Sequence, residues 1–169
     1  MTADSVAFVG VVGGAGTTRT VFELAGALAG GGRHALVFDL DFATEGLSRV
    51  VDGRIETDAA AILGDPTMEL TEAVYDIPVE GSGRLGVVPA FSPLRTLGEA
   101  MSPEAGERVG ERLEAAGEQF DYLLLDVPPV LTNQAIGGVV AADRTVAVVP
   151  PTERGMDALP RERGRLDDL

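Results

Sequence analysis

The chain has 169 residues, a length that fits one domain with a substantial buried core, so we expect a single domain over residues 1–169. Its net charge is −14 and all of its 13 basic residues are arginine, a balance that on average repels nucleic acid and anionic membranes. The absence of cysteine excludes disulfides, cysteine metal sites and thiolate catalysis.

The first elements predict a β-α-β unit. Residues 5–12 form an unbroken apolar run, typical of a central parallel strand that is covered on both faces. A helix over residues 17–29 follows, capped by Thr17 or Thr18, with apolar residues at helical spacing. Residues 35–40 make a second buried strand. This order implies a right-handed crossover and a parallel sheet.

The rest of the chain continues to alternate strands and helices. Further strands of continuous apolar character are predicted over residues 84–89, 121–126 and 145–149. Pro103, at a first helical position, opens a helix that runs to about Glu118. Other helices are expected over residues 46–51, 58–63, 67–75, 132–142 and 152–168. We therefore predict an α/β fold, a three-layer sandwich with a mainly parallel sheet and helices on both faces.

A glycine-rich loop joins the first strand to the first helix. Residues 13–18 (GGAGTT) aim backbone N–H groups and a helix N-terminus at one point, which suits a phosphate. A working P-loop also has a lysine after its last glycine, and here that position is Thr17. The loop is therefore either a phosphate cradle without its charge or a tight turn with no ligand. A dinucleotide site is not expected, because Arg19 stands where its third glycine would be.

Aspartates follow two of the predicted strands. Asp39 and Asp41 end the second strand and Asp126 ends the fourth, at the carboxyl edge where such sheets bind ligands. Carboxylates that face a phosphate loop require a cation between them, usually Mg²⁺. One would hold the metal's water shell and another would orient a nucleophilic water. The alternative is that these aspartates only cap the helices that follow.

Taken in order, these segments resemble the MinD/ParA family of deviant Walker A ATPases, P-loop NTPases of the SIMIBI class. The glycine loop is followed by residues 38–41 (FDLD), 120–129 (FDYLLLDVPP) and 142–150 (ADRTVAVVP). Each motif alone is weak evidence for the family, but the motifs occur in the family's order and together cover nearly the whole chain. The resemblance implies ATP bound with Mg²⁺ in a sandwich dimer, whose hydrolysis times release from a membrane, DNA or a partner.

The resemblance also implies roles for individual residues. Asp41 would be the catalytic, water-orienting carboxylate, and Thr18, Asp39 and Asp126 would hold Mg²⁺. The family's two loop lysines fall here on Val12 and Thr17. Loss of the loop lysine also occurs in CpaE/TadZ-like members, which position pilus machinery. Nucleotide-binding residues would be Gly13, Gly14, Ala15, Gly16, Thr17, Thr18 and Arg19.

Two functions fit this sequence. The first is a degenerate switch or scaffold in intracellular positioning or partitioning, such as cell division, chromosome or plasmid partition, or placement of surface machinery, with weak or absent ATP hydrolysis. The alternative is an active Mg-ATP-dependent ATPase that uses backbone amides, Thr17, Thr18 and Arg19 in place of lysine. A third possibility is an unrelated P-loop-like fold, such as a small-molecule-binding Rossmann relative.

Composition also bears on partners and location. We expect protein partners and a homodimer across the glycine-loop face, rather than nucleic acid or membrane, because of the net charge of −14. No apolar run reaches the roughly 18 residues of a spanning helix and no basic signal start is present, which predicts a soluble, cytoplasmic protein. An acidic, lysine-free composition is typical of salt-loving, haloarchaeal-type organisms. Family members are usually longer, so we expect their adenine-contacting C-terminal segment to be missing.

Overall fold

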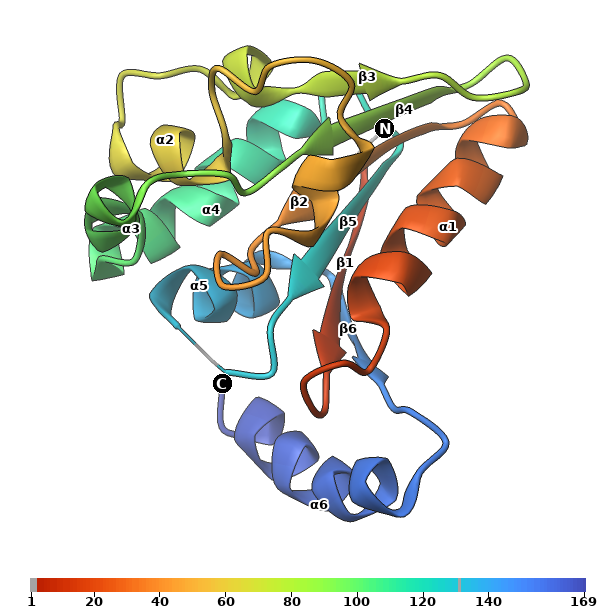
Figure 1. Cartoon of the computed structure of the whole chain (residues 1–169), viewed down its shortest axis with the longest axis vertical. Helices are drawn as coiled ribbons and strands as arrows, with labels where there is room; N and C mark the ends of the chain where they lie inside the picture. The colour runs from red at the N-terminus through yellow and green to blue at the C-terminus, as the bar shows by residue number, and fades with distance from the viewer. Residues whose placement is uncertain (1–2, 131) are drawn as a thin grey trace.

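The computed structural model describes residues 3–130 and 132–169, which build a six-stranded sheet between layers of helices (Figure 1). The strand order is β3-β4-β2-β5-β1-β6, and all neighbours are parallel except β3, which runs antiparallel to β4. The strands are β1 (Asp4–Gly10), β2 (His34–Asp39), β3 (Tyr75–Ile77), β4 (Arg84–Val88), β5 (Tyr122–Val127) and β6 (Arg144–Val148).

Helices cover both faces of this sheet. Helix α1 packs on one face through Val21, Ala25 and Ala29, while α2, α4 and α5 share a second apolar core with the other face. Helix α6 lies beyond the end of β6 (Figure 1). The α-helices are α1 (Thr17–Gly30), α2 (Ala59–Gly64), α3 (Leu94–Ala100), α4 (Pro103–Ala116), α5 (Asn133–Ala141) and α6 (Glu153–Asp167), and the 3₁₀ helices are η1 (Gly46–Val50) and η2 (Leu70–Ala73). The predicted α/β fold with a mainly parallel sheet is confirmed.

The central predicted strands follow from continuous apolar runs that the sheet buries on both faces, whereas β6, at the edge of the sheet, is mostly exposed. In β2 and β5, every side chain after the first residue is buried. The helix predicted from Pro103 is α4, which Ser102 caps by accepting a hydrogen bond from the Ala105 amide at 3.1 Å. These elements were predictable because their signals are local.

One predicted helix, over residues 67–75, is wrong. The structure has a single 3₁₀ turn there, η2, closed by a reciprocal hydrogen-bonded box between Glu69 and Glu72. The chain then extends into β3, where Tyr75 lies opposite Val87 of β4. The Tyr75 hydroxyl donates to the Thr57 carbonyl at 2.9 Å. A strand of three residues gives too short an alternation to detect, and its pairing partner decides its conformation.

Helices α4 and α5 approach each other through glycines. A Cβ at Gly137 would overlap the carbonyl oxygen of Gly106, and one at Gly106 would lie 2.7 Å from the Asn133 carbonyl oxygen. Gly164, in α6, has no atom within 4 Å of the corresponding position. The helices can therefore pack this closely only while residues 106 and 137 lack side chains.

This close packing predicts opposite effects for two identical substitutions. Gly137→Ala should lower the free energy of unfolding by about 1–3 kcal/mol, because the added methyl forces α4 and α5 apart. Gly164→Ala should raise it by up to about 1 kcal/mol, because alanine is the better helix former. Urea denaturation of both variants measures this difference, and a neutral or stabilising Gly137→Ala would contradict the packing described.

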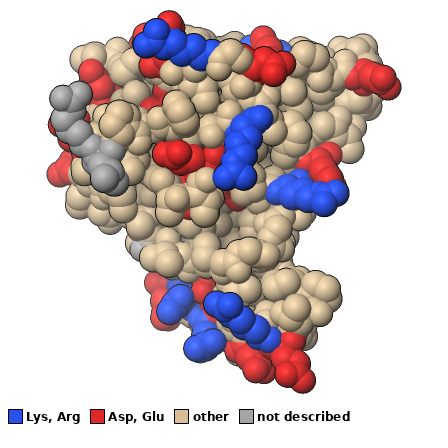
Figure 2. All heavy atoms as spheres, viewed as in Figure 1, with Lys and Arg blue, Asp and Glu red and all other residues tan. Residues whose placement is uncertain are grey.

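The charged surface is mixed. On the face that Figure 2 shows, arginines lie beside acidic side chains, including those over α6 at the lower end of the molecule. Arg163 pairs with Asp167 at 3.7 Å and Arg165 with Glu162 at 3.2 Å. Within the part of the chain that the structure describes, no helix combines the length and apolar character needed to cross a bilayer.

Candidate functional site

The glycine loop and the ends of β2 and β5 meet at one edge of the sheet, the lower edge in Figure 1. They enclose a cavity of about 460 Å³. Its wall includes the whole segment from Val12 to Arg19, together with Asp41 and Asp126. The structure thus brings together every residue predicted to bind nucleotide, and two of the predicted carboxylates.

The loop has the backbone shape of a phosphate cradle. Gly14 and Gly16 have φ values of 77° and 85°, the left-handed region that glycine adopts at low cost. Gly16 is the N-cap of α1, so the prediction that Thr17 or Thr18 caps this helix is wrong: they are its first two residues. No side chain caps the first turn. Its N–H groups therefore have no side-chain acceptor, as an anion site requires.

The two threonines face different neighbours. A Cβ added to Gly10 would lie 2.6 Å from the Thr17 hydroxyl oxygen, so this side chain packs against the end of β1. A Cβ added to Gly46 would lie 2.9 Å from the Thr18 methyl carbon. The Thr18 side chain also interacts with the Asp126 carboxylate and lowers the pKa of Asp126. Thr18 therefore links the loop to the end of β5.

Asp39 and Asp126 form a buried carboxylate pair. They lie opposite each other in the register of β2 and β5, and their exposed fractions are 0% and 2%. Burial, then repulsion by Asp126, raises the pKa of Asp39 well above its usual range, and amides of Asp41 and Leu47 offset part of this rise. Burial raises the pKa of Asp126 to about 6. The Asp126 Oδ2 atom is buried without a hydrogen-bond partner.

Asp41 is more accessible to solvent than Asp39 and Asp126, and its hydrogen bonds hold the turn that follows β2. Its carboxylate accepts hydrogen bonds from the Ala43 amide at 3.1 Å and from the Thr44 hydroxyl at 2.8 Å. Asp39 likewise accepts from the Leu47 amide at 3.4 Å. The alternative expectation, that a strand-end aspartate caps the helix that follows, describes part of what Asp39 does, whereas the bonds of Asp41 close a turn. Sequence analysis missed Thr44, although a threonine three residues after an aspartate is a recognisable turn pattern.

Positive charge is scarce at this cavity. Arg19 is the only basic residue among the described residues of the wall. Its side chain is 82% exposed, and its Nε donates to Glu23 Oε1 at 2.7 Å, one helical turn along α1. The loop therefore offers a phosphate its backbone amides, while the side chains around it are mainly neutral or acidic.

These residues fit magnesium and a nucleotide phosphate by shape and donor type. A threonine hydroxyl and a buried carboxylate with an unpaired oxygen are ligands that Mg²⁺ accepts, usually together with waters and phosphate oxygens. Within residues 3–130 and 132–169, no cluster of three or more His, Asp or Glu side chains could hold a metal alone. A metal here would therefore depend on oxygens from a bound phosphate.

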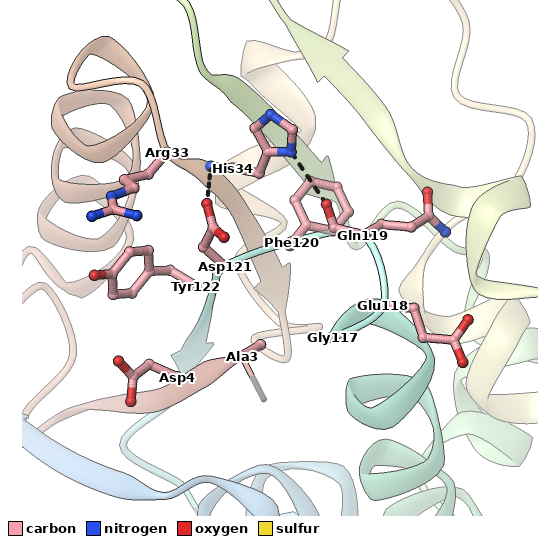
Figure 3. A pocket seen from close by; sticks show the side chains of 10 residues that line it. All are labelled: Ala3, Asp4, Arg33, His34, Gly117, Glu118, Gln119, Phe120, Asp121 and Tyr122. Carbon is pink, nitrogen blue, oxygen red and sulfur yellow. Dashed lines mark hydrogen bonds between the residues drawn. The ribbon is translucent and has the colours of Figure 1, made fainter. Parts of the chain in front are cut away.

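A second, polar cavity of about 340 Å³ lies around the start of β2 and β5, at the opposite edge of the sheet (Figure 3). The Asp121 carboxylate accepts from the His34 amide at 2.9 Å, and His34 Nδ1 lies 3.4 Å from the Gln119 carbonyl oxygen. The Asp121 amide donates to the His34 carbonyl at 2.7 Å. These groups satisfy one another and fix the start of the strands, so we assign this cavity a structural role.

Comparison with known proteins agrees with this geometry. The family model described as an AAA domain matches residues 3–161. The sporulation initiation inhibitor protein Soj of Bacillus subtilis is 27% identical over 157 residues, which cover 85% of this chain and 57% of Soj. The maintenance of carboxysome distribution protein A of Synechococcus elongatus is 25% identical over 153 residues, or 88% of this chain and 59% of that protein. The chain thus spans less than three fifths of either relative.

Among solved structures, the septum site-determining protein MinD of Pyrococcus horikoshii in complex with Mg-ADP superposes with a TM-score of 0.82. Its sequence is 20% identical, and the match covers 98% of this chain and 65% of that one. At this identity, the likeness concerns the fold. The match over residues 3–161, the relatives and the six-stranded sheet together show that the chain belongs to the AAA-domain family of MinD/ParA-type P-loop ATPases.

Proposed function

We propose that this chain is a degenerate MinD/ParA-like nucleotide switch or scaffold that acts in intracellular positioning or partitioning, with weak or absent ATP hydrolysis. The names of its relatives, a sporulation inhibitor and a carboxysome distribution protein, support a role of this kind. The observation that carries the proposal is a phosphate-shaped loop beside buried carboxylates, with Val12 and Thr17 where the family has lysines.

The remaining groups fit defined tasks at a bound nucleotide. The amides of residues 13–18 would hold phosphate oxygens, and Thr18 with Asp126 would hold Mg²⁺, backed by Asp39. When bound, the metal would neutralise phosphate charge. Asp41, the most accessible of the three carboxylates, would orient a water at the open side of the cavity. Without a lysine, only backbone amides and one exposed arginine can stabilise the negative charge that develops in the transition state. Hydrolysis is therefore slow.

The alternative, an active Mg-ATP-dependent ATPase, is supported by a different observation. Thr18 lies close enough to Asp126 to lower the pKa of its carboxyl, and one Asp126 oxygen is unpaired, so the two residues would support a metal ion beside the loop. In this alternative Arg19 leaves Glu23 and supplies the missing positive charge. That exchange costs little, because an exposed ion pair is worth about 1 kcal/mol or less.

The proposed partners are proteins. The acidic charge of −14 opposes DNA and anionic lipid, and several arginines are already paired with acids on the surface. A copy of the same chain across the glycine-loop face would place a second protomer next to the cavity. We propose a cytoplasmic location for this activity.

Titration with Mg-ATP in multimolar salt, followed by a phosphate-release assay, tests the proposal. We expect saturation only at millimolar ATP, or none, and a release rate equal to that of Asp41→Ala within error. Omitting Mg²⁺ should abolish whatever binding is seen, because Asp126 and Asp39 then repel the phosphates. Turnover that Asp41→Ala abolishes would establish the active ATPase instead.

A further inference from the structure

The two edges of the sheet are protected to different degrees. At one edge, β3 has only three residues, and its central Asp76 pairs with Arg84 at 2.7 Å. At the other edge, β6 has five residues and carries no charge after its first, Arg144. Short strands and charged side chains keep a sheet edge from pairing with a further strand. The edge formed by β6 has neither protection.

The side chains of β6 are exposed, although the strand has the sequence of an interior one. Residues 144–147 are all exposed, and Val146 has an exposed fraction of 42%. Residues 145–149 read TVAVV, a run of β-branched and small apolar side chains that favours a strand. Strands of continuous apolar character are normally covered on both sides in a parallel sheet. The layer that covers β1 and β5 therefore stops short of β6.

The outer edge of β6 presents unused backbone groups. The Val148 carbonyl accepts from the Val11 amide at 3.1 Å, so the backbone groups of Val148 point toward β1. Those of successive strand residues point to opposite edges, so Val146 also faces β1, whereas Thr145 and Ala147 face away from the sheet. Among the described residues, β6 pairs only with β1. The N–H and C=O groups of Thr145 and Ala147 are therefore available to an added strand.

Charge allows that strand to come from a second copy of this acidic chain. No residue from Thr145 to Thr152 is charged, in a chain whose net charge is −14. The one charge in β6, on Arg144, is paired with Asp4 at 3.0 Å. Two copies that meet at this edge therefore bring uncharged segments together, which is the arrangement that electrostatic repulsion between acidic chains opposes least.

The strand is also complementary to itself. In an antiparallel pair centred on Val146, the middle residue of β6, Val146 lies opposite its counterpart and Thr145 lies opposite Ala147 of the second copy. The outward-facing residues thus pair with each other and exchange N–H···O=C hydrogen bonds, as an antiparallel ladder requires. Each Arg144 lies opposite a Val148, so the two arginines are at opposite ends of the ladder. Such a symmetric contact uses both outer edges and closes the dimer.

We propose that two copies of this chain associate edge to edge through β6, antiparallel and centred on Val146, and so join two six-stranded sheets into one. The contact includes none of the residues that line the glycine-loop cavity, so it forms with or without nucleotide and does not rest on the proposed function. A pair of short strands is a small interface, and we expect a Kd on the order of 10 μM or weaker.

Sedimentation velocity over a range of protein concentrations, with EDTA present, tests this dimer. The natural protein should pass reversibly from monomer to dimer. Val146→Lys should weaken association at least about tenfold, because two lysines then lie directly opposite each other. Val140→Lys is the matched control, since it adds the same charge at a valine of α5 that is 63% exposed, and it should change the Kd less than about twofold.

A charge pair tests the register. Val146→Glu alone should also be monomeric, because two carboxylates then meet at the centre of the ladder. An equimolar mixture of Val146→Lys and Val146→Glu should form the dimer again, because opposite charges then meet. This restoration requires that residue 146 of one copy lies opposite residue 146 of the other.

Amide hydrogen exchange of the natural protein tests the same contact without any substitution. As the concentration rises through the Kd, exchange of the Thr145 and Ala147 amides should slow at least about tenfold, because they gain hydrogen bonds. The Val146 and Val148 amides, which already face β1, should change less than about twofold.

Four outcomes would overturn the proposal. The first is a monomer at every concentration, the result expected if β6 instead accepts a strand from another protein. The second is association that requires Mg-ATP, as a dimer across the glycine-loop face would. The third is equal association of Val146→Lys and Val140→Lys, and the fourth is a Lys and Glu mixture that stays monomeric.

Discussion

The Thr17→Lys variant should bind Mg-ATP about 10- to 100-fold more tightly than the natural protein. A charged hydrogen bond is worth about 1.5–3 kcal/mol, which corresponds to that range of affinity. The loop already has the required backbone shape, with Gly14 and Gly16 at positive φ and open space around both. What it lacks is a positive side chain that reaches into the cavity, since Arg19 is paired with Glu23 outside it.

Thr71→Lys is the matched control for this prediction, because it adds the same charge at an exposed threonine remote from the cavity wall. It should change affinity by less than about twofold in molar salt, where long-range attraction is screened. Calorimetric titration of both variants with Mg-ATP measures the contrast. Equal affinities for Thr17→Lys and the natural protein would mean that this loop is a turn and not a phosphate cradle.

Asp126→Asn should stabilise the protein by up to about 3 kcal/mol near pH 7.5, in the absence of divalent cations. The pKa of Asp126 is raised from 3.8 to about 6 in the folded state, and a difference of that size corresponds to about 3 kcal/mol. Burial is the main cause, since the ionised carboxylate has lost its hydration. An amide of the same shape carries no such cost.

The stabilisation by Asp126→Asn should depend on pH in one definite direction. A carboxyl group with a raised folded-state pKa stabilises the fold fully only below its unfolded value of 3.8, and this contribution is lost as pH rises through about 6. The advantage of Asp126→Asn should therefore vanish near pH 4 and grow up to about pH 7. Denaturation curves with EDTA at several pH values measure it. Added Mg²⁺ should reduce the advantage, because a bound cation stabilises the ionised carboxylate.

Asp143 provides a control of opposite sign. The Ser5 hydroxyl and amide donate to its carboxylate at 2.6 and 2.8 Å and hold its pKa below the usual value. Its contribution is therefore present above the unfolded pKa and is lost as pH falls through the lower folded value. Asp143→Asn should not stabilise the protein at pH 7.5. A stabilising Asp143→Asn, or an Asp126→Asn advantage that is equal at pH 4 and pH 7.5, would refute this electrostatic account.

The sequence by itself determined the strands that carry the site and the loop between β1 and α1. Continuous apolar runs identify β1, β2 and β5, because strands buried on both faces have no polar alternation. Three glycines after a strand indicate a turn with positive φ, and Gly14 and Gly16 adopt it. Asp39 and Asp126 could be located at one edge because parallel strands end on the same side of a sheet.

Only the tertiary structure decided features that depend on residues far apart in the chain. Tyr75 extends into β3 because Val87 lies opposite it, against the helical pattern of the preceding residues. Arg19 could have entered the cavity, yet the structure pairs it with Glu23. The Thr132 hydroxyl and Gln134 Oε1 are left unpaired because of the groups that surround them once the elements have packed. Local patterns set which elements form, whereas hydrogen-bond satisfaction is settled only when those elements meet.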